Sequence, residues 1–333
     1  MYVKKELQVA YYSNLLCIHS DLDGISNEVL AQFFNPGFDK TVSYDYEFFD
    51  DPNKIQIFFE TDNIVFSDIS PTQEIYDKLI LSGKNIKIFD HHESSIWIKH
   101  KPGCVHDNNR SGTKILFEEY VLSRFARYKP IVREFVEMVS VYDLWELDSL
   151  LRPMSEDLQR VFVKYGNWGL DDNLARHDRF ISAMTKKFKK RDKFSWNPTE
   201  LMYIQEAKAS EDKAYQEAMS MLQIRKDNMG KRFGVYSAWG KISIVCHRML
   251  NVDNMNVDYL VCAQTFHNKW GTMSLRSRKG EFDLTELAGV KGHKSSAGAI
   301  LTPEDTQRFM QENLCFRYKS DLKSEDEPVI EAC

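Results

Sequence analysis

The sequence lacks the features that mark secreted, zinc-binding or membrane-spanning proteins. Its six cysteines are scattered over 333 residues, and no two of them form a CxxC pair. This spacing argues against a structural zinc site and favours a reducing compartment, so we predict a cytoplasmic protein. No apolar run approaches the roughly 18 residues that cross a bilayer, and residues 1–13 lack the pattern of a signal peptide. We therefore expect no membrane partner.

The chain also lacks a strong net charge, because 44 Lys and Arg residues stand against 49 Asp and Glu residues. This small difference conceals an uneven distribution. Residues 1–150 carry 15 basic and 24 acidic side chains, whereas residues 151–320 carry 28 basic and 20 acidic ones. An acidic half suits cation binding, and a basic half suits a phosphate-bearing ligand. Two domains that simply attract each other would show the same division.

The order of apolar patterns predicts an α/β protein with more than one domain. Over residues 1–150, short Val, Ile, Leu and Phe runs alternate with helical patterns, which is typical of a parallel sheet covered by helices on both faces. Residues 151–232 show helical periodicity without strand candidates and predict a helical connector. Residues 233–318 predict a smaller α/β domain, and the acidic residues 319–333 predict a flexible tail. In the first domain we expect strands at 15–19, 41–49, 63–68 and 85–90.

The stretch CIHSDLDGIS at residues 17–26 places His19, Asp21 and Asp23 on alternate positions after a buried strand. Alternate side chains of an extended chain point to the same face. Two carboxylates at that spacing repel each other unless a positive charge lies between them, and a divalent cation would supply it. The same residues also suit a strand-to-helix turn in which Asp21 or Asp23 is the N-cap of the helix that follows.

Acidic and histidine residues also follow the other predicted strands. Because carboxyl ends of parallel strands meet at one edge of a sheet, we expect these side chains to gather there. Capping does not account for adjacent histidines, whereas Asp and imidazole without thiolate suit manganese or magnesium better than zinc. The string HHESS does not fit the zinc-protease pattern HExxH, because Ile96 stands four residues after His92. The residues concerned are Asp68, Asp90, His91 and His92, with Asp143 at the end of a predicted helix.

Four of these strings occur in an order that resembles the motifs of the DHH phosphoesterase superfamily: HSDLDG (19–24), FSDIS (66–70), DHH (90–92) and YD (142–143). Residues 274–299 resemble the DHH-associated substrate-binding domain of that superfamily. The resemblance covers nearly the whole chain. It implies a DHH catalytic domain at 1–150 and a DHH-associated domain at 233–318, joined by the connector at 151–232.

The resemblance further implies two manganese ions, with magnesium as the alternative. His19 and Asp21 would hold one ion, and Asp68 would bridge the two. Asp23, His91 and Asp143 would hold the second ion. Asp90 would orient His91, as carboxylates beside metal-bound imidazoles do. His92 would face the substrate and polarise the phosphate or its leaving oxygen.

The resemblance also implies substrate-binding residues in both domains. NNRSGT (108–113) matches a phosphate-contacting turn, in which Arg110, Ser111 and helix N–H groups would face an anion. In the second domain, Arg276, His293 and Lys294 match positions that hold the terminal phosphate of a short nucleotide. The family has a run of four glycines where this chain has GVKG at 289–292. Valine and lysine adopt positive φ less readily than glycine.

The activity implied is that of a manganese-dependent phosphodiesterase. Short RNA or DNA oligonucleotides and linear dinucleotides would be hydrolysed to nucleoside 5'-monophosphates by two-metal in-line attack of water. The chain length and the absence of apolar spans favour the stand-alone nanoRNase and pAp-phosphatase branch. A RecJ-like single-strand exonuclease, a cyclic-dinucleotide or pAp phosphoesterase and a non-catalytic nucleotide-binding regulator stay open as alternatives, and so does a homodimeric assembly.

Overall fold

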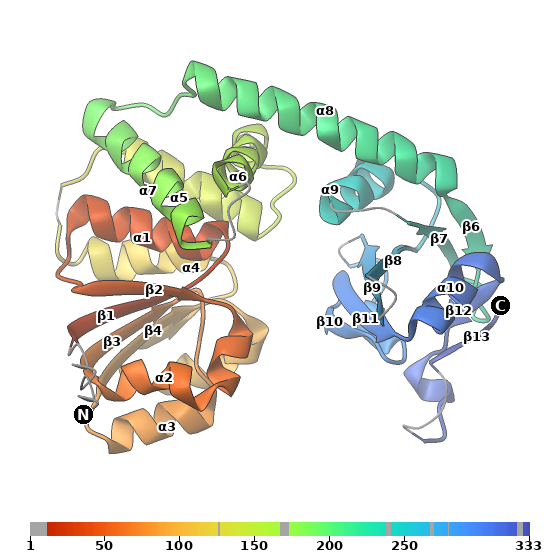
Figure 1. Ribbon diagram of the computed structural model, residues 1–333, viewed down its shortest axis with the longest axis horizontal. Helices are drawn as coiled ribbons and strands as arrows, with labels where there is room; N and C mark the ends of the chain where they lie inside the picture. Colours follow the sequence, from red (N-terminus) through yellow and green to blue (C-terminus); the bar gives the residue numbers. More distant parts are fainter. Residues whose placement is uncertain are drawn as a thin grey trace, which may run out of the picture. The chain divides into compact units, whose positions relative to one another are not determined.

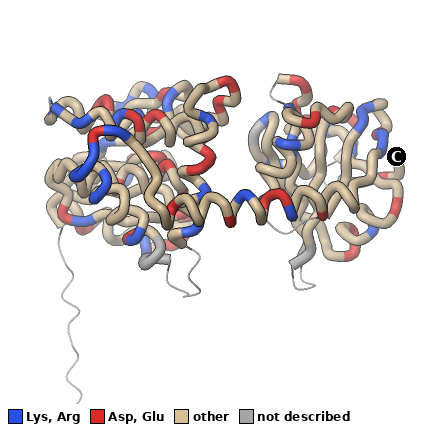
Figure 2. Tube along the Cα trace, turned by 90° about the horizontal axis from the view of Figure 1, so that it is seen from above, with Lys and Arg blue, Asp and Glu red and all other residues tan. Residues whose placement is uncertain are grey.

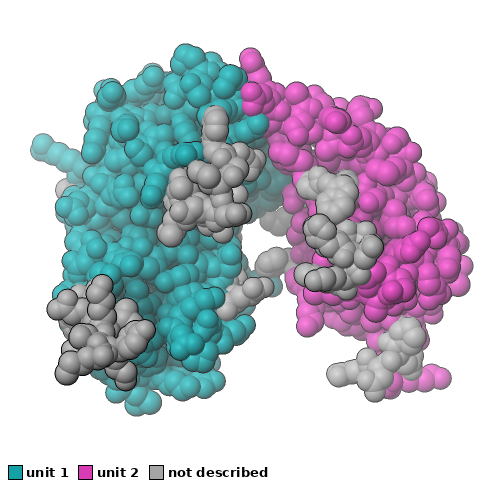
Figure 3. Space-filling view, viewed as in Figure 1, with its two compact units in different colours: residues 1–204 teal, residues 205–333 magenta. Residues whose placement is uncertain are grey.

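The computed structural model describes residues 12–125, 127–166, 173–237, 241–266, 270–278, 280–324 and 329–333. The chain divides into two compact units, unit 1 with residues Met1–Ile204 and unit 2 with residues Gln205–Cys333 (Figure 1, Figure 3). Lys and Arg residues lie among Asp and Glu residues in each unit, so neither unit carries charge of one sign alone (Figure 2). Within the described ranges, no helix combines the length and apolar character needed to cross a membrane.

Unit 1 is built on a five-stranded sheet in which every strand pairing is parallel, which confirms the predicted α/β class. The strand order is β2-β1-β3-β4-β5. Because β1 pairs with β2 on one side and with β3 on the other, the winding of the chain reverses between β1 and β3. Ligand sites of open parallel sheets form at such a reversal, outside the carboxyl ends of the strands. The strands are β1 (Tyr12–His19), β2 (Lys40–Tyr44), β3 (Thr61–Ser67), β4 (Asn85–Asp90) and β5 (Cys104–His106).

Helices cover both faces of this sheet, with α2 and α3 on one face and α1, α4 and α5 on the other (Figure 1). Four consecutive residues of β1, 15–18, explain this arrangement, since all are fully buried. Leu15 and Cys17 pack in one core, while Leu16 and Ile18 pack in the other. Alternate apolar residues therefore face opposite sides of the sheet, and both sides need a cover. The α-helices are α1 (Leu22–Phe34), α2 (Pro52–Phe59), α3 (Gln73–Leu81), α4 (Gly112–Ile115) and α5 (Pro130–Asp143). The 3-10 helices η1 (Tyr46–Asp50) and η2 (Glu93–His100) and the π-helix η3 (Leu116–Val121) lie between them.

The helices predicted for 151–232 are α6 (Arg152–Gly166), α7 (Asn173–Lys190) and α8 (Pro198–Met221). α7 packs against α1 and α6 and contributes the buried Phe180, Met184 and Phe188 to the core of unit 1. Unit 1 ends at Ile204, inside α8, so the predicted connector divides between the two units. A strand, β6 (Gln223–Lys226), lies in the range where the sequence showed no strand candidate. Three of its four residues are exposed, which explains the missing apolar pattern.

Unit 2 contains a mixed six-stranded sheet in the order β10-β11-β9-β8-β7-β6. Phe233, Tyr259 and Phe282 stack ring on ring in its core. The last strand, β13 (Ile330–Ala332), pairs antiparallel with β12 (Leu314–Phe316), so the tail predicted to be flexible ends in a strand, while 325–328 lie outside the described residues. The other elements are β7 (Arg232–Tyr236), α9 (Ile242–His247), η4 (Arg248–Val252), β8 (Tyr259–Phe266), β9 (Trp270–Ser277), η5 (Leu284–Glu286), β10 (Lys291–His293), β11 (Ser296–Leu301), α10 (Pro303–Gln311) and η6 (Lys319–Asp321).

Candidate metal centre

The turn from β1 into α1 carries the first group of candidate ligands. β1 ends at His19 and α1 begins at Leu22, so the chain is not extended as far as Asp23, and of the two interpretations of this stretch the strand-to-helix turn is confirmed. Asp23 lies in the first helical turn. Asp21 is the N-cap of α1, because its Oδ1 accepts a hydrogen bond from the N–H of Gly24 at 2.9 Å. Its Oδ2 lies 2.9 Å from Nδ1 of His19. Asp21 therefore caps the helix with Oδ1, while Oδ2 faces His19 and the candidate metal site.

The first turn of α1 lies directly against the end of β1. A Cβ at Gly24 would lie 2.1 Å from the backbone oxygen of His19, so only glycine fits there. This close approach brings Asp23 to the edge of the sheet, where it is 2% exposed. Its carboxylate accepts hydrogen bonds from the N–H groups of Gly112 at 2.6 Å and Thr113 at 3.0 Å. A turn almost ninety residues away in the sequence thus holds Asp23 in place.

Asp68 follows β3 and lies at the centre of the site. Its φ of 62° is in the left-handed region, which is uncommon for residues other than glycine and recurs at functional sites. A Cβ at Gly112 would lie 2.4 Å from Cβ of Asp68, so the turn at 112 packs directly on this aspartate. Asp68 is 1% exposed, and its Oδ2 accepts no hydrogen bond from the described residues. A buried carboxylate oxygen without a donor is costly unless a cation contacts it.

The carboxylate of Asp90, at the end of β4, contacts the ring of His92. The resemblance had implied that Asp90 orients His91 instead. Asp90 Oδ1 lies 2.8 Å from Nδ1 of His92 and accepts the backbone N–H of His91 at 2.7 Å. Its Oδ2 accepts the hydroxyl groups of Ser70 and Ser95. Burial would raise the pKa of Asp90, but the hydrogen bond and charge of His92 and the serine hydroxyls lower it well below its usual value. Asp90 is therefore a fixed negative charge behind the ring of His92.

His91 connects Asp68 to Asp143, the last residue of α5. His91 Nε2 lies 3.2 Å from Asp68 Oδ1 and 3.3 Å from Asp143 Oδ2. Burial raises the pKa of Asp68 well above its usual value, and the charges of Asp23 and Asp21 raise it further. Burial and the charge of Asp23 raise the pKa of Asp143 in the same way. Burial lowers the pKa of His91, which favours the neutral imidazole that metals bind. Carboxylates that oppose one another's ionisation are stabilised by a cation.

These side chains form three overlapping groups, and within each group the potential ligand atoms lie within 4.8 Å of one another. Asp68 belongs to two groups, as does His91. Converging carboxylate oxygens and imidazole nitrogens suit a divalent cation, and the donor-free oxygen of Asp68 fits the same ligand. The sheet edge is therefore a candidate divalent-metal site, and it brings together all six residues that the sequence predicts as ligands. The groups are His19, Asp21 and Asp68; Asp23, His91 and Asp143; and Asp68, His91 and His92.

The turn at 108–113 does not present the phosphate-binding surface that the sequence predicts. Arg110 Nε lies 2.7 Å from Asp107, and its Nη1 lies 2.8 Å from Glu118 and 2.9 Å from Glu119. Three carboxylates therefore occupy the guanidinium. Ser111 is fully buried and caps α4, and the N–H groups of the two residues that follow donate to Asp23. In this structure the turn serves to position a candidate ligand.

The three residues predicted to bind phosphate in unit 2 lie on or beside neighbouring strands. Arg276 of β9 pairs with Ser296 of β11, and Ser296 pairs with His293 of β10. Arg276 Nη1 donates to the carbonyl of Leu275 at 2.8 Å, and its Nη2 donates to Ser243 Oγ at 3.2 Å. Lys294 follows β10, and its side chain is 78% exposed. The side chain of His293 lies outside the described residues.

The loop that replaces the family's glycine run is accommodated without backbone strain at the replaced positions. Gly289 and Gly292 have φ of 69° and 133°, whereas Val290 and Lys291 do not have positive φ. Val290 is buried in the core of unit 2. The loop therefore keeps glycine at the two positions whose backbone has positive φ.

Sequence reasoning missed three polar residues of the site. Asp45 follows β2, and one of its carboxylate oxygens lies 3.8 Å from Nε2 of His19. The strand expected at 41–49 hid this residue, because β2 ends at Tyr44 and Asp45 is another acid at a strand end. Ser70 and Ser95, which hold Asp90, stand within or next to motifs that the sequence already marked. Polar residues that directly follow a parallel strand were predicted to lie at the functional edge. Asp45 would have been among them had the end of β2 been placed correctly at Tyr44.

Comparisons with known proteins show which proteins this chain resembles. No family model matches the sequence. A curated relative, oligoribonuclease NrnB of Bacillus subtilis (strain 168), is 24% identical over 322 residues, which cover 88% of this chain and 74% of the relative. The solved DHH domain of a member of the s1p family of ribosomal proteins has a TM-score of 0.60 at 13% identity, covering 90% of this chain and 84% of that chain. Exonuclease RecJ bound to manganese has a TM-score of 0.49 at 13% identity, covering 90% and 88%.

Three observations agree with the resemblance noted in the sequence. The curated relative aligns with most of both chains, and the solved DHH domain shares the fold. The four sequence motifs lie at one edge of the parallel sheet, and their carboxylates and imidazoles converge there. The chain therefore resembles the DHH phosphoesterase superfamily in its sequence motifs and in its fold, and its sheet edge is a candidate divalent-metal site.

Proposed function

We propose that this protein is a two-metal phosphodiesterase that hydrolyses short oligonucleotides and linear dinucleotides to nucleoside 5'-monophosphates. The observation that carries the proposal is the position of Asp68. Its Oδ1 lies 3.2 Å from Nε2 of His91, and its Oδ2 lies 3.8 Å from Nδ1 of His19. The two oxygens of one carboxylate therefore face two ligand groups, as a bridge between ions roughly 3.5–4 Å apart requires.

His19 and Asp21 would hold one ion, and Asp23, His91 and Asp143 would hold the other. This ligand set of carboxylate and imidazole, without thiolate, favours manganese, with magnesium as the alternative. Bound ions of this kind lower the pKa of water and neutralise charge on the oxygens at phosphorus. The hydrogen bonds from Gly112 and Thr113 orient Asp23, so this candidate ligand is held in place by the protein itself.

His92 is the residue that we assign to the leaving oxygen. Burial alone would lower its pKa, but the hydrogen bond and charge of Asp90 raise the pKa of His92 above its usual value. Because Nδ1 faces Asp90, proton transfer to the leaving oxygen would come from Nε2. Asp90 is then a positioning residue, because it fixes the ring and stabilises the imidazolium without touching the substrate.

For the substrate, the name of the curated relative, an oligoribonuclease, supports RNA oligonucleotides. We propose that Arg276, with His293 and Lys294, holds a terminal phosphate in unit 2. The cross-strand pairing of Arg276 with Ser296, and of Ser296 with His293, supports this proposal because adjacent strands lie about 5 Å apart. Binding energy from a remote phosphate would position the scissile bond and favour short strands.

A panel of substrates tests the proposal against its alternatives. Manganese-loaded protein is given two-, five- and twenty-nucleotide RNA and DNA, pAp, linear and cyclic dinucleotides, and pyrophosphate, and the rates are compared. Fastest turnover of the two- and five-nucleotide strands is expected. Preference for the twenty-nucleotide strand would indicate a RecJ-like exonuclease. Preference for pAp or cyclic dinucleotides would indicate those phosphoesterases, and binding without turnover would indicate a regulator.

A further inference from the structure

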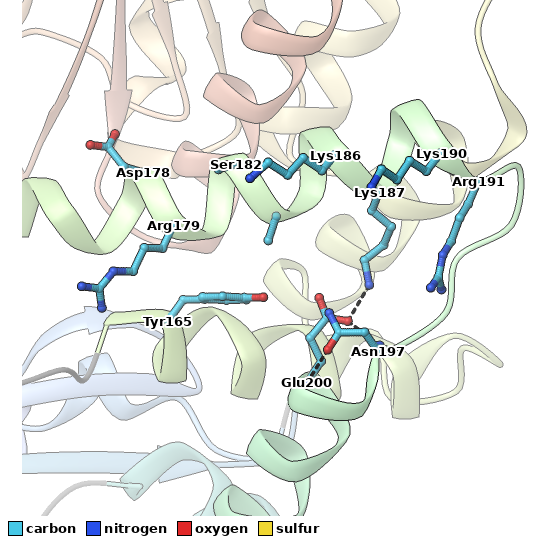
Figure 4. Close-up of a pocket in the computed structure, with 11 residues that line it drawn as sticks. Tyr165, Asp178, Arg179, Ser182, Lys186, Lys187, Lys190, Arg191, Asn197 and Glu200 are labelled. Atoms are coloured by element: carbon cyan, nitrogen blue, oxygen red, sulfur yellow. Dashed lines mark hydrogen bonds and ion pairs between the residues drawn. The ribbon is translucent and has the colours of Figure 1, made fainter.

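A basic cavity lies among the helices that follow the metal-binding sheet in unit 1. Its volume is about 720 Å³, within the range of small-molecule sites, roughly 300–1,000 Å³. Residues of α6, α7 and the start of α8 line it, and none of them belongs to the candidate metal ligands (Figure 4). Its lining includes two acids, Asp178 and Glu200, and five cations: Arg179, Lys186, Lys187, Lys190 and Arg191.

One of the two acids is already neutralised by a buried ion pair. Glu200 Oε2 lies 2.6 Å from Nζ of Lys187, and the two side chains are 0% and 6% exposed. The same oxygen accepts the N–H of Asn197, whose Oδ1 accepts the N–H of Glu200, so the two residues form a reciprocal cap at the start of α8. Glu200 therefore adds little negative potential to the cavity. Figure 4 shows this pair reaching from α7 to α8.

The remaining cations have no such partner. Arg179, Lys186 and Lys190 are exposed and form no ion pair or hydrogen bond with any residue that the structure describes. Among the residues that the structure describes, the guanidinium of Arg191 donates hydrogen bonds only to neutral oxygens of Ser195. Lys186 and Lys190 stand four residues apart on α7, where like charges repel by about 0.2–0.5 kcal/mol. Unneutralised cations around a concave surface give it a positive potential, which attracts anions.

We propose that this cavity binds the phosphate groups of a nucleotide, with Lys186 and Lys190 as principal contacts and the ring of Tyr165 beside the base. Tyr165 is half-buried, and Figure 4 shows it lying across the cavity from the α7 side chains. Phenol rings of this kind stack on any base, while lysines contact phosphates. A free mononucleotide and a nucleotide unit within an RNA strand offer the same chemistry. The site goes beyond the proposed function, because its occupation needs no hydrolysis.

The test measures binding in the presence of a chelator, so that no substrate is hydrolysed. One arm titrates a labelled twenty-nucleotide RNA, and the other titrates a nucleoside triphosphate. The variant Lys186→Glu/Lys190→Glu is compared with Lys189→Glu/Lys193→Glu, which changes the net charge equally at exposed lysines outside the cavity. All four positions are exposed, so both variants should fold, and circular dichroism checks this.

We expect Lys186→Glu/Lys190→Glu to weaken binding of at least one ligand about tenfold and the control to change it less than about twofold. For RNA, the negative slope of log K, the binding constant, against log salt concentration should become shallower by about 1.4. Each of the two lost lysine–phosphate contacts removes about 0.7. Weaker triphosphate binding identifies a free nucleotide as ligand, and an effect on RNA alone identifies the strand. Equal binding by variant and control for both ligands overturns the proposal. Failure of the proposed hydrolysis would leave these measurements intact.

Discussion

Asp90 Oδ1 lies 2.8 Å from Nδ1 of His92, at the end of strand β4. The same carboxylate accepts the backbone N–H groups of His91 and His92 and two serine hydroxyls. A carboxylate with this many donors keeps its charge while fully buried. One aspartate therefore sets both the direction and the charge of the histidine that we assign to the leaving oxygen.

Replacing His92 should separate chemistry from binding. His92→Ala should lower kcat by about 10²–10⁴ with a smaller effect on KM, because its contact strengthens as charge develops on the leaving oxygen. Steady-state kinetics on a dinucleotide measures both constants, and His100→Ala, at an exposed histidine, is the control. Unchanged kcat with raised KM would show that His92 is only a binding group.

The coupling between Asp90 and His92 can be measured with a double-mutant cycle. Asp90→Asn should reduce kcat strongly in the wild-type background and much less in the His92→Ala background, because Asp90 acts through the ring of His92. Equal reductions in both backgrounds would mean that Asp90 acts independently. The unfolding temperature of each variant shows whether loss of the hydrogen bonds from Ser70 and Ser95 has destabilised the fold.

Removing the metal ions, or Asp68, which faces both ligand groups, should remove turnover. Chelator should abolish activity, and manganese should restore it best, because the ligands are carboxylate and imidazole. Asp68→Ala should reduce turnover by more than tenfold and weaken metal binding measured by calorimetry, since both ligand groups lose a carboxylate oxygen. Asp77→Ala, an exposed aspartate on α3, is the matched control. Turnover of Asp68→Ala within tenfold of wild type contradicts the two-metal proposal.

Gly112 should tolerate no side chain. A Cβ there would lie 2.4 Å from Cβ of Asp68, and Gly112 donates to the carboxylate of Asp23. Gly112→Ala should therefore displace both aspartates and weaken metal binding. Gly298→Ala is the control, because its Cβ would meet Met273 at an ordinary 3.5 Å. Metal titration of both variants is the measurement, and equal affinities would show that this packing does not position the ligands.

The residues of unit 2 should affect short substrates selectively. Arg276→Ala should cut dinucleotide turnover sharply while leaving hydrolysis of a small generic phosphodiester almost unchanged, because only the dinucleotide offers a remote phosphate. Arg308→Ala, at an exposed arginine of α10, removes the same charge as a control. If Arg276→Ala degrades dinucleotides as fast as wild type, another group holds the terminal phosphate.

The buried pair of Lys187 and Glu200 should stabilise unit 1 as a pair. Lys187→Met leaves the carboxylate of Glu200 buried without its cation, so it should lower the free energy of unfolding by about 3 kcal/mol. Lys189→Met, at an exposed position of the same helix, should change it by less than about 0.5 kcal/mol. Denaturant unfolding measures both. A loss no larger than that of the control would show that the pair contributes little.

Particular residues show which parts of the site sequence reasoning could predict. Leu15 and Ile18 belong to a continuous apolar run, which is typical of a strand buried on both faces and therefore of a parallel sheet. Parallel strands bring their carboxyl ends to one edge, so His19, Asp68 and Asp90 were predicted to meet there without knowledge of the chain path. The spacing of polar residues at strand ends is a local property that the sequence displays directly.

Other assignments depended on contacts between residues far apart in the chain. Arg110 looked available to a phosphate, but the fold places Glu118 and Glu119 against it. The N–H groups after Ser111 face Asp23, which lies about ninety residues earlier. The partner of Asp90 depended on the backbone direction after β4, since His91 and His92 are equally near in sequence.

The order of apolar runs and polar strand ends was therefore sufficient to predict the sheet and the edge at which Asp and His side chains gather, whereas the choice of six of them as ligands came from the family resemblance. Strand periodicity and parallel pairing leave few other places for those side chains. Which oxygen caps a helix, which histidine Asp90 holds, and which cations of α7 stay unneutralised were settled by packing. These outcomes follow from hydrogen bonds and charges brought together across the chain, and sequence spacing does not specify such contacts.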